Sequence, residues 1–220
     1  MPLMTSAASI LVCFAVKEEA SHFTRLADSR PGVRILLTGM GRRNAERTIA
    51  AALQERRPRL VITAGFAGAL LPELTRGEVV FDVDKETGLE PGLRSAGARP
   101  VRFHCAERVV TTVEEKRALR AASGAEAVEM ESGFIRSLCR KEGVPAGTVR
   151  VILDTADEDL VLDFNQLMTA EQRIDGRKLA FTVLKNPSKI PALLAFQKQS
   201  AQAAKRLGET LAQVLGFEPD

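Results

Sequence analysis

Apolar runs alternate with segments of helical periodicity along most of the chain. Residues 9–15 and 33–38 form near-continuous apolar runs, which are typical of strands covered on both faces. Residues 18–26 between them allow only a short helix. Apolar residues then recur at helical spacing from residue 44 to 58, which predicts a helix of about three turns. A third apolar run at 60–64 completes a strand, helix, strand unit.

The rest of the chain continues this alternation. Residues 85–100 are rich in Gly, Pro and charge and have no apolar period, so a surface loop is predicted there. The last helix is expected to pack across the sheet through one apolar stripe, formed by Ala201, Ala204, Leu207 and Leu211. Further strands are predicted at residues 78–83, 108–110, 127–130 and 148–153, and helices at 114–122, 133–142, 179–184 and 190–215. We therefore expect an α/β fold, a three-layer sandwich with a central mixed sheet flanked by helices, in a single domain over residues 1–220.

Composition excludes several classes of protein. The 31 basic and 28 acidic residues are scattered along 220 residues, which argues against nucleic-acid binding. The first apolar run is too short to cross a bilayer and is followed by two glutamates, so no membrane insertion is expected. Cys13, Cys105 and Cys139 lack C-x-x-C spacing, which predicts reduced structural thiols in a cytoplasmic protein. His22 and His104 have no spacing that would predict a metal site.

Five short segments place a glycine or an acid where a predicted strand ends, which is where open α/β sheets bind ligands. Gly39-Met40-Gly41 does not complete a dinucleotide fingerprint, because Asn44 stands where the third glycine belongs. An NAD site is therefore not expected. The five segments are A-V-K-E-E at 15–19, T-G-M-G at 38–41, T-A-G-F-A-G-A-L at 63–70, A-V-E-M-E-S at 127–132 and V-I-L-D-T-A-D at 151–157.

Taken together, these segments resemble the nucleoside phosphorylase superfamily. The similarity is greatest to the branch that holds methylthioadenosine/S-adenosylhomocysteine nucleosidases and shorter hopanoid-associated phosphorylases, and it covers roughly residues 10–157. V-E-M-E-S is the most specific segment, and A-G-F-A-G-A-L followed by G-E-V-V is the second. Leu162-Asp163-Phe164 and the Ala-rich last helix are more similar to the hopanoid-associated branch. The resemblance implies cleavage of the N-glycosidic bond of an adenosine-like purine nucleoside by a homo-oligomer without a cofactor.

The resemblance also implies roles for acidic residues. Asp154 matches the aspartate that protonates the leaving purine at N7, and the apolar run at 149–153 is expected to raise its pKa by desolvation. Asp157 is a competing candidate for this acid. Glu131 matches the glutamate that accepts hydrogen bonds from the ribose hydroxyls. Glu19 matches the acid that activates water in hydrolytic members, although it could instead be a charge at a helix start.

Other residues of the same segments are expected to line the substrate site. They are Met130 against the sugar face, Glu129 in the same motif, and the backbone of Gly65, Phe66 and Ala67 near the nucleophile. Gly41 and Arg42, with Arg43, could bind inorganic phosphate as a co-substrate, although solvated charge at a helix start is the more ordinary role for these arginines.

Two departures leave the activity open. Phe66 stands where the nucleosidases have a small hydroxyl residue, and Leu153 stands where they have a serine. Lost hydroxyls remove hydrogen bonds to a ligand and can redirect specificity. Hydrolysis, phosphorolysis and a non-catalytic nucleoside-binding protein whose nucleophile pocket is filled by Phe66 therefore remain alternatives.

Overall fold

A mixed β-sheet forms the centre of the molecule in a computed structural model, which describes residues 9–28, 30–167, 169, 178, 185 and 187–217. The strand order is β2-β1-β3-β8-β4-β5, with β7 added at the end of β3 and β6 paired to β7. The strands are β1 (Ile10–Phe14), β2 (Val33–Leu37), β3 (Leu60–Ala69), β4 (Val79–Val83), β5 (Arg99–Pro100), β6 (Phe103–Cys105), β7 (Ala127–Glu129) and β8 (Ala146–Asp154).

The sheet is parallel through β2, β1, β3 and β8, and β4 runs antiparallel to β8. Strands β1 and β8 are buried along their whole length, as expected for strands that are covered on both faces.

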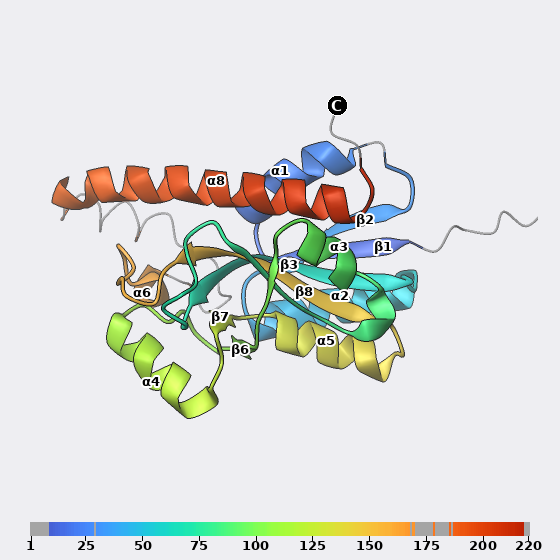
Figure 1. Cartoon of the computed structure of the whole chain (residues 1–220), viewed down its shortest axis with the longest axis horizontal. Coiled ribbons are helices and arrows are strands. Elements are labelled where there is room, and N and C mark those ends of the chain that lie inside the picture. Colours follow the sequence, from blue (N-terminus) through green and yellow to red (C-terminus); the bar gives the residue numbers. More distant parts are fainter. Residues whose placement is uncertain are drawn as a thin grey trace, which may run out of the picture.

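Helices cover both faces of this sheet (Figure 1). Helices α1 and α8 lie on one face, and α2 and α5 lie on the other. The predicted three-layer α/β sandwich is therefore confirmed. The helices are α1 (Lys17–Ala27), α2 (Arg42–Glu55), α3 (Glu90–Ser95), α4 (Val113–Ser123), α5 (Ser132–Lys141), α6 (Phe164–Leu167) and α8 (Ile190–Val214), with short 3₁₀ turns η1 (Lys85–Thr87) and η2 (Pro187–Lys189).

The long helix α8 packs across the sheet beside α1, as predicted (Figure 1). Leu207 and Leu211 are fully buried in a core that also contains Phe23 of α1 and Val149 of β8. The predicted stripe is wrong at one position: Ala201 is exposed, and Ala203 takes its place beside Ala204 in the buried face.

Strand β3 is longer than the apolar run that predicts it, because the glycine-rich segment continues the strand to Ala69. It pairs with β8 throughout, and the register shifts between Ala67 and Gly68. Gly65 pairs with Arg150 and Gly68 pairs with Asp154, so three residues of β3 match four of β8. The extra residue lies in β8, so β3 keeps its alternation: Phe66 faces the α8 core and Ala67 faces the opposite side.

Three other predictions differ from the structure or lie outside it. The loop predicted at 85–100 is wrong, because this segment holds α3, and Leu93 of that helix is fully buried in the α8 core. The strand predicted at 108–110 is also wrong. The side chain of Asn165 hydrogen-bonds both the N–H and the carbonyl of Val109, so this backbone needs no strand partner. The helix predicted at 179–184 lies outside the described residues.

Within the described part of the chain, no helix combines the length and the apolar character needed to cross a membrane.

The close contact between α8 and α1 depends on Gly208. A Cβ atom at Gly208 would lie 2.9 Å from both the backbone nitrogen of Phe23 and Cδ2 of His22. We expect Gly208→Ala to lower the free energy of unfolding by about 1–3 kcal/mol, although alanine favours a helix. Gly92→Ala in α3 is the matched control, since its Cβ would meet only Val214 at an ordinary 3.5 Å. Denaturant unfolding of both variants checks this, and a Gly208→Ala protein as stable as wild type would contradict the packing.

Candidate active site

A buried cluster of three glutamates surrounds one arginine at the end of the sheet. Arg150 comes from β8, Glu129 from β7, Glu131 from the start of α5 and Glu19 from the first turn of α1. All four residues are at most 8% exposed. Buried charges require partners, and Arg150 is the cation that these carboxylates share, 2.8 Å from Glu129 and 3.9 Å from Glu131.

Glu129 is the anchor of this cluster. Its carboxylate accepts hydrogen bonds from Arg150, from the backbone N–H groups of Glu131 and Ser132 and from the Ser132 hydroxyl. Burial alone would raise the pKa of Glu129, but Arg150 and these backbone donors outweigh it and lower the pKa. Glu129 therefore stays ionised and fixes the turn that carries Glu131.

The pKa of Glu131 is raised, in contrast to that of Glu129. Its Oε1 accepts a 2.8 Å hydrogen bond from the N–H of Gly41, which joins the end of β2 to this cluster. Burial, followed by the negative charge of Glu129, raises the pKa of Glu131 to about 8, against the opposing effect of Arg150. Near neutral pH this carboxyl can hold or release a proton, so it can both accept from and donate to hydroxyl groups of a ligand.

Glu19 is fixed by backbone donors from two strand ends. Its carboxylate accepts hydrogen bonds from the N–H groups of Ala15 and Val16 at 3.0 and 3.2 Å, and from that of Phe66 at 2.8 Å. Burial raises its pKa, while Arg150 and these donors lower it less strongly. Gly65 allows the close approach, because a Cβ atom there would lie 2.5 Å from Oε1 of Glu19.

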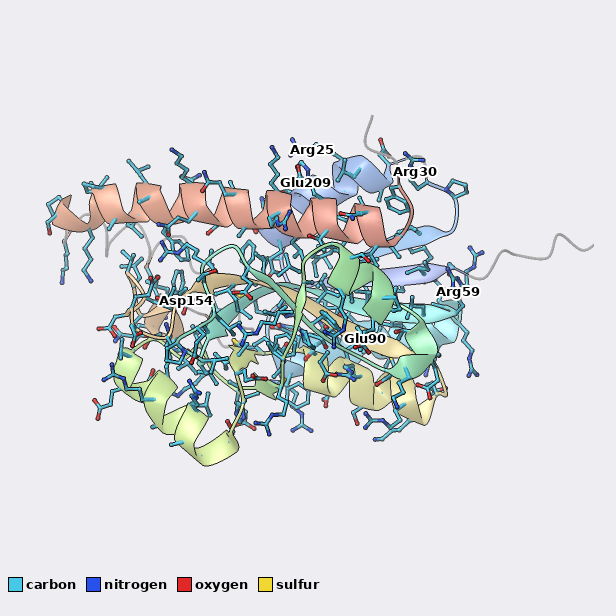
Figure 2. All side chains as sticks on the ribbon, viewed as in Figure 1. Arg25, Arg30, Arg59, Glu90, Asp154 and Glu209 are labelled. Carbon is cyan, nitrogen blue, oxygen red and sulfur yellow. The ribbon has the colours of Figure 1, made fainter. Side chains whose placement is uncertain are left out.

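Asp154 ends β8 (Figure 2) and lies opposite Gly68 of β3. Its Oδ2 is 2.6 Å from Nζ of Lys116, which is completely buried in α4. Burial raises the pKa of Asp154, as expected from the sequence, and Lys116 opposes this rise. A Cβ atom at Gly68 would lie 2.9 Å from Oδ2 of Asp154, so this glycine admits the carboxyl just as Gly65 admits Glu19.

The other predicted site residues divide into two groups. Gly41, Gly65 and Phe66 contact the cluster through their backbones, Ala67 is buried beside them, and Met130 is half-buried between Glu129 and Glu131.

Three charged candidates lie apart from the cluster. The Asp157 side chain is 63% exposed and pairs with Arg117. The exposed guanidinium of Arg42 pairs with Glu46 and lies over the Phe134 ring, and Arg43 is exposed beside it.

Arg150 and Lys116 are the charged groups that the sequence reasoning did not assign. Arg150 interrupts the run at 149–153 that was expected to be purely apolar. A lone charge in a buried strand is a signal for a paired site. Lys116 stands among charged neighbours in a helix that looks solvated, and no sequence pattern distinguishes it from them.

Among the described residues, no three His, Cys, Asp or Glu side chains are grouped so that they could hold a metal ion.

The fold and this site can now be compared with known proteins. A family model described as the phosphorylase superfamily matches residues 13–84 and 89–185, so the chain belongs to this superfamily. Among curated relatives, the 5′-methylthioadenosine/S-adenosylhomocysteine nucleosidase of Glaesserella parasuis is 28% identical over 171 residues, which are 62% of this chain and 74% of that protein. The enzyme of the same name from Geobacillus thermodenitrificans is 28% identical over 174 residues, 61% of this chain and 71% of that protein.

Solved structures share the fold over nearly the whole chain. Futalosine hydrolase of Helicobacter pylori has a TM-score of 0.70 at 16% identity and covers 94% of this chain and 97% of its own. The methylthioadenosine/S-adenosylhomocysteine nucleosidase of Campylobacter jejuni has a TM-score of 0.69 at 14% identity, with 95% and 99% covered. The predicted superfamily is confirmed, whereas the likeness to the hopanoid-associated branch stays a prediction.

The raised pKa of Glu131 should make the free energy of unfolding depend on pH. Folded Glu131 keeps its proton up to a pH of about 8, whereas the unfolded chain releases it near 4.5. Between these values the folded state binds more protons, so the free energy of unfolding should fall as pH rises. Glu131→Gln cannot titrate and should flatten this part of the curve. Denaturant unfolding from pH 4 to 9 measures it, with Glu114→Gln on the exposed side of α4 as control. An unchanged slope in Glu131→Gln would contradict the assignment.

Proposed function

We propose that this protein is an enzyme that cleaves the N-glycosidic bond of a purine nucleoside by hydrolysis. The observation that carries the proposal is the pair of buried carboxyls, Glu19 and Asp154, that approach the same strand at Gly65 and Gly68. Superfamily membership supports the reaction class. The names of the relatives, nucleosidases acting on 5′-methylthioadenosine and S-adenosylhomocysteine, support a purine with a modified 5′ position.

The two carboxyls are spaced so that one could protonate the base while the other activates a water at the sugar. Gly65 and Gly68 are three residues apart on β3, which corresponds to roughly 10 Å along a strand. Carboxyls that act as acid and as water-activating base across a glycosidic bond stand roughly 6.5–9.5 Å apart, which leaves room for the water and the sugar. The two glycines that admit Glu19 and Asp154 are thus separated by a distance of this order.

Asp154 would supply the leaving group with its proton. Cleavage of the ribosyl C–N bond leaves negative charge on the departing purine, and a neutral carboxyl next to the base removes that charge by protonating it. Burial at the end of β8 favours the protonated form of Asp154. Asp157 is the weaker candidate, because its carboxylate is exposed and paired with Arg117.

The charge around Glu19 favours water over phosphate as the nucleophile. Three carboxyl groups and a single guanidinium surround this position, and ionised Glu129 already pairs with that guanidinium, so no net positive charge is left to bind a phosphate dianion. Arg42 and Arg43, the side chains expected to bind phosphate, are exposed and Arg42 is paired with Glu46. Nε and Nη1 of Arg150 are buried without a hydrogen-bond partner among the described residues. These two donors could hold a water or a ligand hydroxyl beside Glu19.

The alternative of an inactive binding protein is disfavoured by the position of Phe66. Its side chain packs against the core beneath α8, and its strand partner Val151 belongs to that same core. Side chains alternate along a strand, so Arg150 faces the other side of the sheet. Phe66 therefore presents only its backbone N–H to Glu19. A ring in this position does not occupy the neighbourhood of Arg150 and Glu19.

Two further expectations complete the proposal. We propose that the enzyme needs no cofactor and acts as a cytoplasmic homo-oligomer, as first expected from the family resemblance. Size-exclusion chromatography with light scattering tests the oligomeric state.

The reaction is tested by measuring release of free base from adenosine, inosine, methylthioadenosine, S-adenosylhomocysteine and futalosine. Asp154→Asn should lower kcat/KM about 100-fold or more, because the amide cannot give its proton to the purine. Asp157→Asn is the matched control and should keep wild-type activity. Ligand-induced stabilisation of the wild type without release of base from any nucleoside would favour a binding protein. Equal activity of wild type and Asp154→Asn would exclude Asp154 as the acid.

The nucleophile is tested separately with and without inorganic phosphate. Base release should not depend on phosphate, and the sugar product should be the free pentose, not its 1-phosphate. Glu19→Gln should lower kcat about 100-fold with a smaller change in KM, because the amide cannot take a proton from water. Glu18→Gln, on the exposed side of the same helix turn, is the control. A strict phosphate requirement would replace hydrolysis by phosphorolysis.

A further inference from the structure

Lys116 is a completely buried lysine whose ammonium group is bound on three sides. Its Nζ lies 2.6 Å from Oδ2 of Asp154 and hydrogen-bonds the carbonyl oxygens of Thr155 at 2.6 Å and Glu158 at 2.8 Å. All three partners are acceptors, and an ammonium has three hydrogens to give. The carbonyls of Thr155 and Glu158 accept two of these hydrogens, and the charged nitrogen lies at ion-pair distance from Asp154.

A buried charge of this kind is costly unless acceptors or an opposite charge lie beside it. The carbonyls of Thr155 and Glu158 stabilise it while Asp154 is protonated, and Asp154 becomes the opposite charge when it gives up its proton. The other charged groups that face Asp154 are Glu158, which disfavours its ionised form, and Arg76, which favours it. Arg76 and Glu158 form an ion pair with each other, and Arg76 also donates to the carbonyl of Leu153. The effects of Arg76 and Glu158 on the pKa of Asp154 oppose each other. Lys116 is the cation in direct contact with the carboxyl.

We propose that Lys116 is a positioning residue of the active site, which fixes Asp154 by Oδ2 and balances the negative charge that Asp154 acquires when it protonates the leaving base. This inference rests on the proposed function. Lys116 also binds the carbonyls of Thr155 and Glu158, one and four residues after Asp154, so it contacts both the carboxyl and the turn that follows it.

The C–N bond breaks and its electron pair passes to the purine, the O–H bond of Asp154 breaks, and an N–H bond forms on the purine. Asp154 becomes a carboxylate beside the Lys116 ammonium, which keeps its three hydrogens throughout. Because Lys116 contacts Oδ2, the acid proton is assigned to Oδ1. Water supplies the hydroxyl of the pentose, and its proton passes to Glu19.

The role of Lys116 should be visible in the pH dependence of kcat/KM. Asp154 must be protonated to act, so activity falls as pH rises through its pKa. An adjacent cation lowers an aspartate pKa by about one to three pH units. Lys116→Met should therefore move the alkaline limb of the profile upward by about one pH unit or more. It should also lower the plateau about ten-fold, because the carboxylate formed in the step loses its counter-charge.

The acidic limb provides an internal reference. It is assigned to Glu19, which belongs to the Arg150 cluster and does not contact Lys116, so Lys116→Met should leave it in place. Arg117→Met is the matched control: it removes a positive charge from the neighbouring position of α4, where the side chain is 73% exposed. This variant should keep the wild-type profile.

Two further variants separate the loss of the Lys116 charge from a failure to fold. Lys116→Gln retains hydrogen-bond donors without the charge and should shift the alkaline limb in the same direction if Lys116→Met does not fold. Lys116→Met/Asp154→Asn removes both charges and should recover part of the stability that Lys116→Met loses. A lower plateau with an unmoved alkaline limb in both Lys116→Met and Lys116→Gln would overturn the proposal and leave Lys116 with a structural role only. Inactivity of the wild type towards every nucleoside would instead refute the proposed function.

Discussion

The end of this sheet depends on the pairing of buried charge. Four carboxyls lie in the protein interior there, and each would be costly to keep without a cation or a proton. Arg150 serves Glu129 directly and Glu131 at longer range, while Lys116 serves Asp154. The two cations differ in how many carboxylates they can contact. A guanidinium has five donors and can be shared among several carboxylates, whereas an ammonium is a compact charge that suits one carboxylate and nearby carbonyls.

Glycine and the β-bulge give these carboxyls access to the strand. Gly65 and Gly68 leave space on β3 for Glu19 and Asp154, and any side chain there would occupy the position of a carboxyl oxygen. The extra residue of β8 sets Asp154 opposite Gly68. The A-G-F-A-G-A-L segment thus contributes space, because its two glycines have no Cβ atom. Its glycines admit two acids, and the Phe66 side chain turns away into the core under α8.

Much of the fold could be predicted because strands covered on both faces form apolar runs, as β1 and β8 do. Strand β2 also follows such a run, but it is a half-buried edge strand and Leu37 is exposed, so its predicted cover on both faces is wrong. Helix α3 was missed because it is short and rich in Gly and Pro, and only Leu89 and Leu93, four residues apart, indicate its buried side. The predicted acids Glu19, Glu131 and Asp154 are all buried at one end of the sheet. Lys116 could not be found this way, since its burial depends on where α4 lies against the turn after β8.

The same charge pairing explains how chemically similar carboxyls can have different roles. Glu129 receives Arg150 and three other donors, so its pKa is lowered and it serves as a fixed anion. Glu131 is two residues away and has weaker contact with Arg150 and a negative neighbour, so its pKa is raised to about 8. Asp154 and Glu19 are raised mainly by burial. An N-glycosidic bond between them would meet an acid at the base and an acceptor for the proton of water at the sugar. Each group's proton affinity is therefore set by its burial together with the cation that reaches it, and the sheet geometry decides both.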